Sequence, residues 1–327
     1  MTVGLLPWGL VTDRLGERRA LSYGLAACGV LIALAARADD AWTAGVLFAA
    51  AGAAGSSVQS ASGRAVMQWF RPAERGLAFG IRQTAVPVGG VIGALALPAL
   101  ADTGLTRAFV FLGVFCVATA LVGGLVVREL PSEGVDPHDV PWTLRDPRLW
   151  LLSSGSTLYV TAQIALFSFF VLYLHDERGF STARAAAAFA TAHVLAMGFR
   201  IGAGRWSDVL GSRILPLRRI GLVTSATLAA VAILLDASIV VVVPLLVVAT
   251  AFSAAWNGLS FVAAAELAGT ARSGAAIGFQ QTALSVTGVF VPPLFAWVVD
   301  VSSWRTAFGV FAVAPLVGWL LLGRVRA

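Results

Sequence analysis

Arg200 is the residue whose type and position point most clearly to chemistry, because it lies inside a long apolar stretch. It precedes Asp208, at the polar end of that stretch, by eight residues, which is about 12 Å along an α-helix. His193 lies seven residues before Arg200 on the same helix face, with Met197 between them. An arginine this deep in an apolar medium is costly unless it faces a cavity or a partner. Arg200 is therefore either a structural residue bound to a carbonyl or carboxylate, or a cation that binds an anion.

Other polar side chains in apolar stretches are candidates for the same binding site. Gln59 and Asn257 are amides separated by 198 positions (257 − 59), and Tyr159 and Gln163 form an i, i+4 pair on one helix face. Such side chains select a polar ligand where they face a cavity, and otherwise join helices by hydrogen bonds.

Arg64 and Arg82 each lie about six residues inside the polar end of an apolar segment, so they share a depth. Ligand contact and a salt-bridge cluster with Glu74 are alternatives for both. Long arginine side chains near helix ends can also extend to the surface.

Two short polar segments share one spacing and suggest a duplication. Gly9, Asp13, Gly16 and Arg18 match Gly204, Asp208, Gly211 and Arg213, and every pair is separated by 195 positions. A second match, with an offset of 198, relates 76–85 to 274–283 and continues through Gly90/Gly288, Asp102/Asp300 and Arg107/Arg305. Register kept over this length predicts two copies of one membrane unit.

The aspartate of each segment suggests a helix cap. A carboxylate at a helix end can accept hydrogen bonds from the N-terminus of a neighbouring helix, where the dipole favours negative charge. A contact that forms in one conformation and breaks in another biases a two-state equilibrium. The alternative is that these charges only fix topology at a tight turn.

Composition identifies the medium around the chain. Of 327 residues, 58% are hydrophobic and 12% charged, with a mean hydropathy of +0.84, whereas a soluble domain carries roughly 25% charged residues. Cys28 and Cys116 lie in separate apolar segments, as packing residues do. The sequence has no Walker loop, zinc-type cluster or Ser/His/Asp set at a common depth. We therefore expect no enzyme, no cofactor and no metal site.

The apolar segments predict an all-α integral membrane bundle. After residues 1–12 they run approximately over 20–36, 42–69, 76–101, 106–127, 149–174, 184–206, 217–235, 238–265, 272–299 and 304–323. Residues 1–127 and 149–327 then form two pseudo-symmetric six-helix halves with about eleven of twelve helices present, joined by a polar linker at 128–148 that contains His138. About 55 residues of the second half precede Gly204 but eight precede Gly9, so symmetry predicts that about 47 residues (55 − 8) are missing at the N-terminus.

Arginine placement predicts orientation and accounts for the net charge of +6. With Gly9–Arg19 inside the cell, the inner loops and tail hold fifteen arginines and the outer loops hold five, namely Arg37, Arg107, Arg178, Arg184 and Arg305. This is the positive-inside bias of a multi-pass protein of the cell (inner or plasma) membrane with a cytoplasmic C-terminus. Nucleic-acid binding is not needed to explain the charge.

The two matched segments carry a resemblance to a known family. Gly9–Arg19 resembles the loop between the second and third helices of major facilitator superfamily transporters, and Gly204–Arg213 resembles its echo between helices eight and nine, with Val209 in place of Arg14. The resemblance covers almost the whole chain. It implies alternating access, with helices four, five, seven, eight and ten lining the site. It also implies a cytoplasmic gate made of Gly9, Asp13, Arg14, Gly16, Arg18, Gly204, Asp208, Gly211 and Arg213.

Arg200 extends the resemblance toward anion carriers. An arginine at this point of helix eight resembles the anion-binding arginine of nitrate/nitrite porters and oxalate/formate antiporters. Leu5 stands at the equivalent position of the first copy (200 − 195), where nitrate porters carry a second basic residue, which argues against nitrate. Pro87 precedes the glycines at 89 and 90, so the antiporter motif of helix five is not established.

The function predicted from the sequence is secondary transport of a small organic or inorganic anion, with Arg200 as counter-charge. One alternative is a proton-coupled drug or metabolite efflux antiporter, and another is a non-transporting sensor or inactive fragment on a carrier scaffold. The expected partners are the anion and the lipid bilayer, for a monomeric protein. Proton coupling stays open, since His193 could titrate and Glu266 lies near a helix end.

Overall fold

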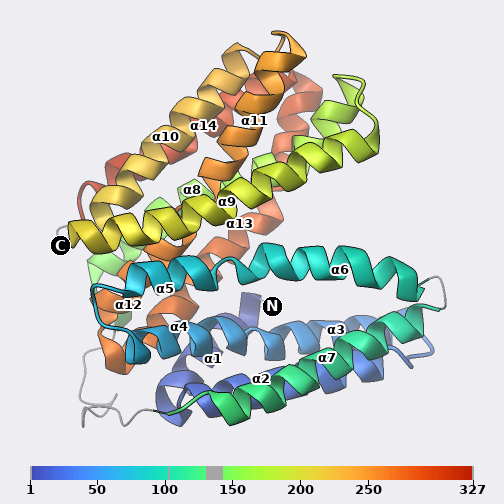
Figure 1. Cartoon of the computed structure of the whole chain (residues 1–327), viewed down its shortest axis with the longest axis vertical. Helices are drawn as coiled ribbons and strands as arrows, with labels where there is room; N and C mark the ends of the chain where they lie inside the picture. Colours follow the sequence, from blue (N-terminus) through green and yellow to red (C-terminus); the bar gives the residue numbers. More distant parts are fainter. Residues whose placement is uncertain (1, 102–103, 130–142, 326–327) are drawn as a thin grey trace. The chain divides into compact units, whose positions relative to one another are not determined.

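The computed structural model describes residues 2–101, 104–129 and 143–325, and in these residues the chain is helical (Figure 1). Most of the expected linker, with His138, and Asp102 lie outside the described residues. The α-helices are α1 (Thr2–Leu15), α2 (Glu17–Ala35), α3 (Ala41–Gly55), α4 (Ser57–Trp69), α5 (Arg75–Arg82), α6 (Ala85–Ala101), α7 (Leu105–Val126), α8 (Pro147–Asp176), α9 (Thr182–Leu210), α10 (Ile214–Ile233), α11 (Ile239–Ser253), α12 (Asn257–Ala268), α13 (Ser273–Val301) and α14 (Trp304–Leu322).

The expected apolar segments coincide with these helices, which confirms an all-α membrane fold. Within the described residues, nine stretches are long and apolar enough to cross a bilayer. Two of them, Ala41–Trp69 and Ile239–Ala268, contain a short break. The α3/α4 break at Ser56 and the α11/α12 break at Ala254 are equivalent by the 198 offset (254 − 56).

A third break, between α5 and α6, does not follow the repeat. It falls at Gln83 and Thr84, whereas α13 continues through the equivalent residues Gln281 and Thr282. Pro87 explains the difference. In a continuous helix the carbonyl of Gln83 would accept a hydrogen bond from residue 87, but proline has no N–H, and the second copy has Ser285 at this position (87 + 198).

Contacts group the chain into two units, each made of three separate segments of the chain. Unit 1 comprises Met1–Arg71, Ala85–Asp146 and Ala264–Thr282, and unit 2 comprises Pro72–Thr84, Pro147–Ala263 and Ala283–Ala327. Thus α5 belongs to unit 2 and the start of α13 to unit 1. The expected division of the chain at 128–148 stays a prediction.

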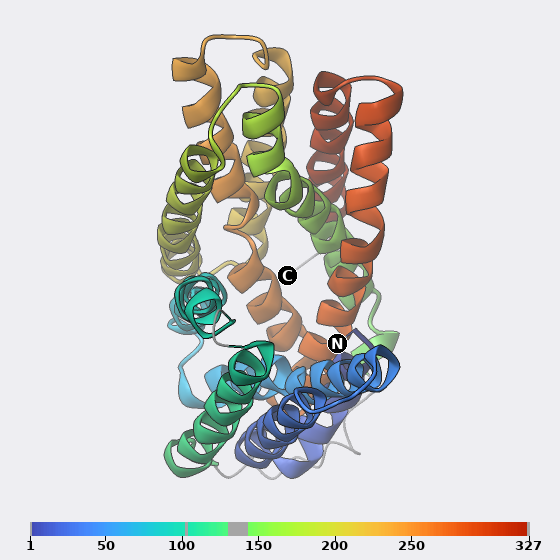
Figure 2. The same cartoon turned by 90° about the vertical axis from the view of Figure 1, so that its right-hand side faces the viewer.

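Unit 1 is built on close contact between α2 and α7, which lie side by side in Figures 1 and 2. Gly29 and Gly113 allow the approach, because a Cβ at Gly29 would lie 2.5 Å from the carbonyl oxygen of Gly113. Small residues are the usual means of bringing membrane helices together. Cys28 is a free cysteine in the same contact region, where it lies 3.0 Å from a Cβ built at Gly55.

Unit 2 has an extensive apolar interior, in which α14 packs against α8 and α10. Its core contains edge-to-face aromatic rings, including those of Phe295, Phe308 and Phe311. Such pairs contribute roughly 0.5–1.5 kcal/mol each beyond their burial. The interior holds α8 and α9, which carry the candidate residues, in fixed positions.

Candidate functional sites: two aspartate caps and a buried arginine

Asp13 caps the N-terminus of α13 within unit 1. Its Oδ1 accepts a hydrogen bond from the backbone N–H of Gly274 at 2.9 Å, and its Oδ2 accepts one from Ala275 at 2.7 Å. These are among the first residues of α13, whose N–H groups have no partner within the helix. The buried carboxylate therefore meets both free donors and the positive end of the helix dipole. We call this arrangement the first cap.

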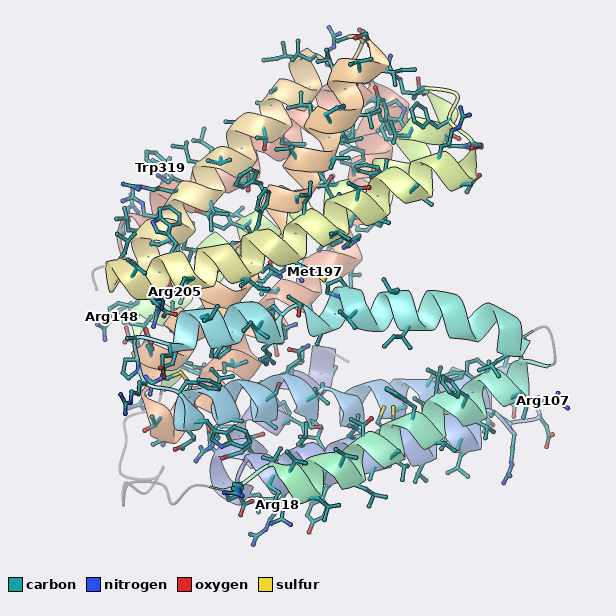
Figure 3. All side chains as sticks on the ribbon, in the orientation of Figure 1. Arg18, Arg107, Arg148, Met197, Arg205 and Trp319 are labelled. Atoms are coloured by element: carbon teal, nitrogen blue, oxygen red, sulfur yellow. The ribbon has the colours of Figure 1, made fainter. Side chains whose placement is uncertain are left out.

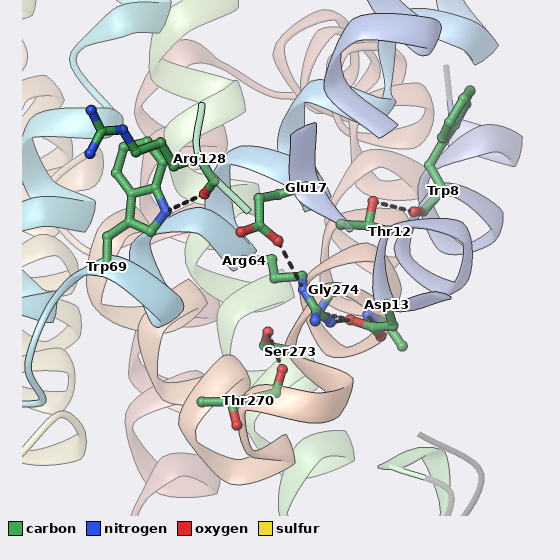
Figure 4. A network of polar contacts seen from close by, with 11 residues as sticks. Trp8, Thr12, Asp13, Glu17, Arg64, Trp69, Arg128, Thr270, Ser273 and Gly274 are labelled. Atoms are coloured by element: carbon green, nitrogen blue, oxygen red, sulfur yellow. Dashed lines mark hydrogen bonds and ion pairs between the residues drawn. The ribbon is translucent and has the colours of Figure 1, made fainter. Parts of the chain in front are cut away.

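The first cap is joined to two other helices by an ion-pair network (Figure 4). Arg64, on α4, donates from Nη1 to Asp13 Oδ1 at 3.0 Å and from Nε to Glu17 Oε2 at 3.3 Å. Glu17 begins α2, and all three side chains are buried. From the sequence, substrate contact and a salt-bridge cluster with Glu74 are alternatives for Arg64. The carboxylates that it binds are those of Asp13 and Glu17, which disfavours substrate contact for this arginine.

Asp208 makes the equivalent cap within unit 2, on α5. Its Oδ1 and Oδ2 accept hydrogen bonds from the N–H groups of Gly76 at 2.9 Å and Leu77 at 2.8 Å. Arg213 supplies the positive charge, from Nη1 to Asp208 Oδ1 at 2.5 Å, and also donates to the Ser207 hydroxyl at 2.7 Å and to the carbonyl of Pro72. We call this arrangement the second cap.

The glycines of the two matched segments do two different things. Gly16 and Gly211 lie at the helix ends with φ of 85° and 60°, a region that glycine adopts without steric cost. Gly9 and Gly204 are inside helices instead, where a Cβ would lie 2.4 Å from the Gly274 carbonyl oxygen and 2.2 Å from that of Gly76. The first glycine of each segment thus lets its helix reach the one that its aspartate caps.

Arg14 and Arg18, the remaining candidates of the first segment, are exposed. Figure 3 labels Arg18 where its side chain extends from the start of α2. Their exposure fits the alternative interpretation for these two residues, in which loop arginines fix topology.

Arg200 is 5% exposed and bound to two backbone carbonyls within unit 2. Its Nε donates to the carbonyl of Ala254 at 2.9 Å, and its Nη1 donates to that of Gln83 at 2.8 Å. Both carbonyls lie at helix breaks, where the regular intrahelical hydrogen bonds end. Arg200 forms no ion pair with any residue that the structure describes.

The other candidates lie at varied places in the two units. His193 lies on the same face of α9 as Arg200. Its ring is between those of Phe167 and Phe189, at centroid distances of 4.7 and 4.4 Å. Gln163 and Asn257 each have a buried side-chain oxygen that accepts no hydrogen bond from the described residues. Gln59 is half-buried on α4.

Tyr159 lies deeper than the other candidates, at 1% exposure. Its ring fills the space beside Gly221 on α10 and Gly318 on α14, where a Cβ would lie 2.0 and 2.8 Å from ring atoms. It also meets Trp256 edge-on, at 6.0 Å between centroids. These contacts give Tyr159 a packing role, and ligand contact stays a prediction.

Sequence reasoning missed Glu17 and Gln83 as site residues. Glu17 could have been suspected because it begins the helix after the Asp13 turn, four residues from that aspartate. Gln83 carries a stronger signal: Pro87, four residues later, removes the N–H that its carbonyl would need. Arg82, a candidate from the sequence, donates from Nη1 to the Gln83 side-chain Oε1 at 2.8 Å.

Comparison with known proteins identifies the family. Residues 1–292 match the model of the Major Facilitator Superfamily. A curated relative, described as the uncharacterized MFS-type transporter Rv2994 of Mycobacterium tuberculosis strain H37Rv, is 32% identical over 320 residues, which are 97% of this chain and 72% of the relative. The chain therefore belongs to the Major Facilitator Superfamily.

Solved structures agree on the fold. The Escherichia coli fucose:proton symporter FucP has a TM-score of 0.79 at 16% identity, covering 99% of this chain and 87% of its own. The human organic anion transporter MFSD10 (TETRAN) also scores 0.79, at 18% identity, with 98% and 80% covered. A bacterial homologue of the iron transporter ferroportin scores 0.72 at 13% identity, with 99% and 88% covered. Family and fold together support secondary transport by alternating access in a multi-pass membrane protein, and point to a transporter rather than an enzyme.

Proposed function

We propose that this protein is a secondary transporter of a small anion and that Arg200 is the counter-charge of that anion. The observation that carries the proposal is a contrast among three arginines whose side chains have little exposed surface. Arg64 and Arg213 are each bound to carboxylates, whereas Arg200, as buried as Arg64, is bound to carbonyls only within the described residues.

Carbonyl groups orient a guanidinium but leave its net charge in place. A buried charge without a counter-ion is strongly unfavourable, and in a membrane helix such a residue is usually functional. The second amino group of Arg200, Nη2, donates no hydrogen bond to any described residue. A guanidinium held by two of its nitrogens and open at the third is suited to binding a carboxylate or a similar oxyanion.

The two caps are our candidates for the gate. Each joins an aspartate to backbone N–H groups far away in the chain, 261 and 262 positions for the first cap and 132 and 131 for the second. Breaking a cap leaves two backbone N–H groups and a carboxylate without their hydrogen-bond partners. The uncapped state is therefore separated from the capped state by a free-energy cost, as the two states of a switch require. The arginine bias supports a position of each cap, and of the C-terminal end, on the cytoplasmic side of the cell membrane.

A ligand panel tests the anion proposal directly. Purified protein in detergent is heated with single compounds, and unfolding is followed by the fluorescence of its 10 tryptophans. The panel contains small carboxylates and inorganic anions, neutral sugars and lipophilic cations at one ionic strength. A bound ligand at a hundredfold excess over its Kd stabilises the folded state by about 2.7 kcal/mol. We expect at least one anion to raise the unfolding temperature, and the same anion to enter proteoliposomes that contain the protein.

Two variants assign the effect to Arg200. Arg200→Gln removes a charge-assisted hydrogen bond worth about 1.5–3 kcal/mol, so anion affinity should fall about 10- to 100-fold. Arg205→Gln is the matched control, because Arg205 is an exposed arginine on the same helix (Figure 3). Unchanged anion affinity in Arg200→Gln would contradict the proposal. Stabilisation by lipophilic cations alone would favour the drug-efflux alternative instead.

A further inference from the structure

Cys28 and Cys116, which lie in separate apolar segments of the sequence, meet where α2 contacts α7 in unit 1. Their two thiols form a hydrogen bond with each other. Both are free cysteines, and the chain has two cysteines in all. Two thiols in contact can react with each other, because a disulfide needs the two sulfur atoms to approach without a large movement of the backbone.

Glycines make room for this contact, at the place where α2, α3 and α7 run together (Figure 1). A Cβ at Gly29, the residue after Cys28, would lie 3.0 Å from the Cβ of Cys116. On α3, a Cβ at Gly55 would lie 3.0 Å from the Sγ of Cys28. Because neither glycine has a side chain, the sulfur of Cys28 fits between the three helices and reaches Cys116.

The two cysteines differ in how an outside reagent can reach them. Cys28 is 9% exposed, whereas Cys116 is half-buried and its neighbours on α7, Val114 and Phe115, are 62% and 52% exposed. Because α7 is long and apolar enough to cross a bilayer, a reagent that reaches Cys116 has to be soluble in lipid. Such a reagent meets Cys116 first, and Cys28 is then positioned as the second thiol.

We propose that Cys28 and Cys116 are a redox site that reacts with lipid hydroperoxides and closes a disulfide between α2 and α7. The Cys116 sulfur attacks one oxygen of the O–O bond, which breaks; the lipid alcohol leaves with the thiol proton, and Cys116 becomes a sulfenic acid. The Cys28 thiol then attacks the Cys116 sulfur, the S–S bond forms, and water leaves with the second thiol proton.

The reaction balances with the hydroperoxide as the oxidant. Two thiols and one hydroperoxide give one disulfide, one alcohol and one water, and two electrons pass from the sulfur atoms to the O–O bond. Arg200 takes no part in this chemistry, so the redox site is independent of the transported substrate.

Thiol counting tests the redox site, because the chain has two cysteines. The full chain in lipid nanodiscs is treated with cumene hydroperoxide, a lipid-soluble probe, then unfolded in SDS and alkylated with N-ethylmaleimide. The intact mass gives the number of alkylated thiols. We expect two before treatment, none after it, and two again when dithiothreitol is added before alkylation.

Variants assign the two roles. In Cys28→Ser the sulfenic acid of Cys116 has no second thiol to react with, so dimedone, which traps sulfenic acids, should label it at least about tenfold more than in the wild type. In Cys116→Ser the buried Cys28 should stay reduced. The matched control combines Cys116→Ser with Val114→Cys, which keeps two thiols but moves one to the opposite face of α7. This control should form no disulfide within the chain.

Three results would overturn the redox site. The first is two alkylatable thiols in the treated wild type. The second is a loss of thiols that dithiothreitol does not restore, since sulfinic and sulfonic acids form without a disulfide. The third is a disulfide that forms equally in the Val114→Cys control, or one that joins two chains and doubles the intact mass. The anion panel decides the proposed function separately.

Discussion

The first and second caps have the same hydrogen-bond pattern but obtain their positive charge from different places. In the first cap, Arg64 comes from α4, 51 positions from Asp13, and also binds Glu17 at the start of α2. In the second cap, Arg213 lies five positions after Asp208, in the loop that follows α9. The first cap therefore links four helices, α1, α2, α4 and α13, whereas the second uses a local charge to support a contact between α9 and α5.

The difference shows how the two copies of a motif can obtain their counter-charge from different places and keep the same hydrogen-bond pattern. The aspartate and both glycines are kept in each copy, because the contact with a helix N-terminus requires all three. The counter-charge can come from any nearby element, and its source differs between the two caps. The first cap also buries two carboxylates with one arginine, so it depends more strongly on that arginine than the second cap depends on Arg213.

Removing the arginine of each cap should give the largest contrast. Arg64→Gln leaves Asp13 and Glu17 buried without their cation, and breaking a buried pair in this way costs about 3–5 kcal/mol. Arg213→Gln should cost less, about 1–3 kcal/mol, because it removes the cation from Asp208, which retains two backbone donors, whereas Arg64→Gln also leaves a second buried carboxylate, that of Glu17, without its cation. The measurement is the unfolding temperature of both variants in one detergent. A loss of stability in Arg213→Gln as large as that in Arg64→Gln would contradict the comparison.

A methyl group at the helix contacts should have a smaller effect, and a similar one in both units. Gly9→Ala and Gly204→Ala would each place a Cβ within 2.5 Å of a backbone oxygen, and overpacking of this kind costs about 1–3 kcal/mol. Gly202→Ala is the matched control, because nothing lies within 4 Å of its Cβ position. In a helix interior that change should stabilise by about 0.5–1 kcal/mol.

The same thermal assay can therefore return opposite signs for Gly204→Ala and Gly202→Ala, two positions apart on one helix. Equal effects at these positions would mean that close approach of α9 to α5 is not what Gly204 provides.

Much of this organisation could be predicted from the sequence because it depends on period and repetition. Apolar segments of helix length predict the bundle, and the 195-residue offset predicts equivalent roles for Asp13 and Asp208. The offset does not predict which helix each aspartate caps. That α13 meets Asp13 and α5 meets Asp208 depends on how distant segments pack, and no local pattern encodes it.

The arginines show the same limit. Several acidic residues of the sequence, Glu74 among them, could pair with Arg64. The fold brings Arg64 to Asp13 and Glu17. One carbonyl partner of Arg200 could have been suspected from the sequence, because Pro87 predicts a free carbonyl at Gln83. Locating Arg200 beside that carbonyl, 117 positions away, required the structure.

The caps themselves are tested most directly by hydrogen exchange at the amides that they bind. The comparison uses Asp13→Asn and Asp208→Asn, which keep side-chain shape and replace one accepting oxygen by an amide nitrogen. Loss of a helix cap costs about 0.5–2 kcal/mol, so exchange should rise about 2- to 30-fold. We predict faster exchange at Gly274 and Ala275 in Asp13→Asn, and at Gly76 and Leu77 in Asp208→Asn, with the larger change always at the aspartate's own pair. Exchange at either pair that does not depend on its own aspartate would contradict the account.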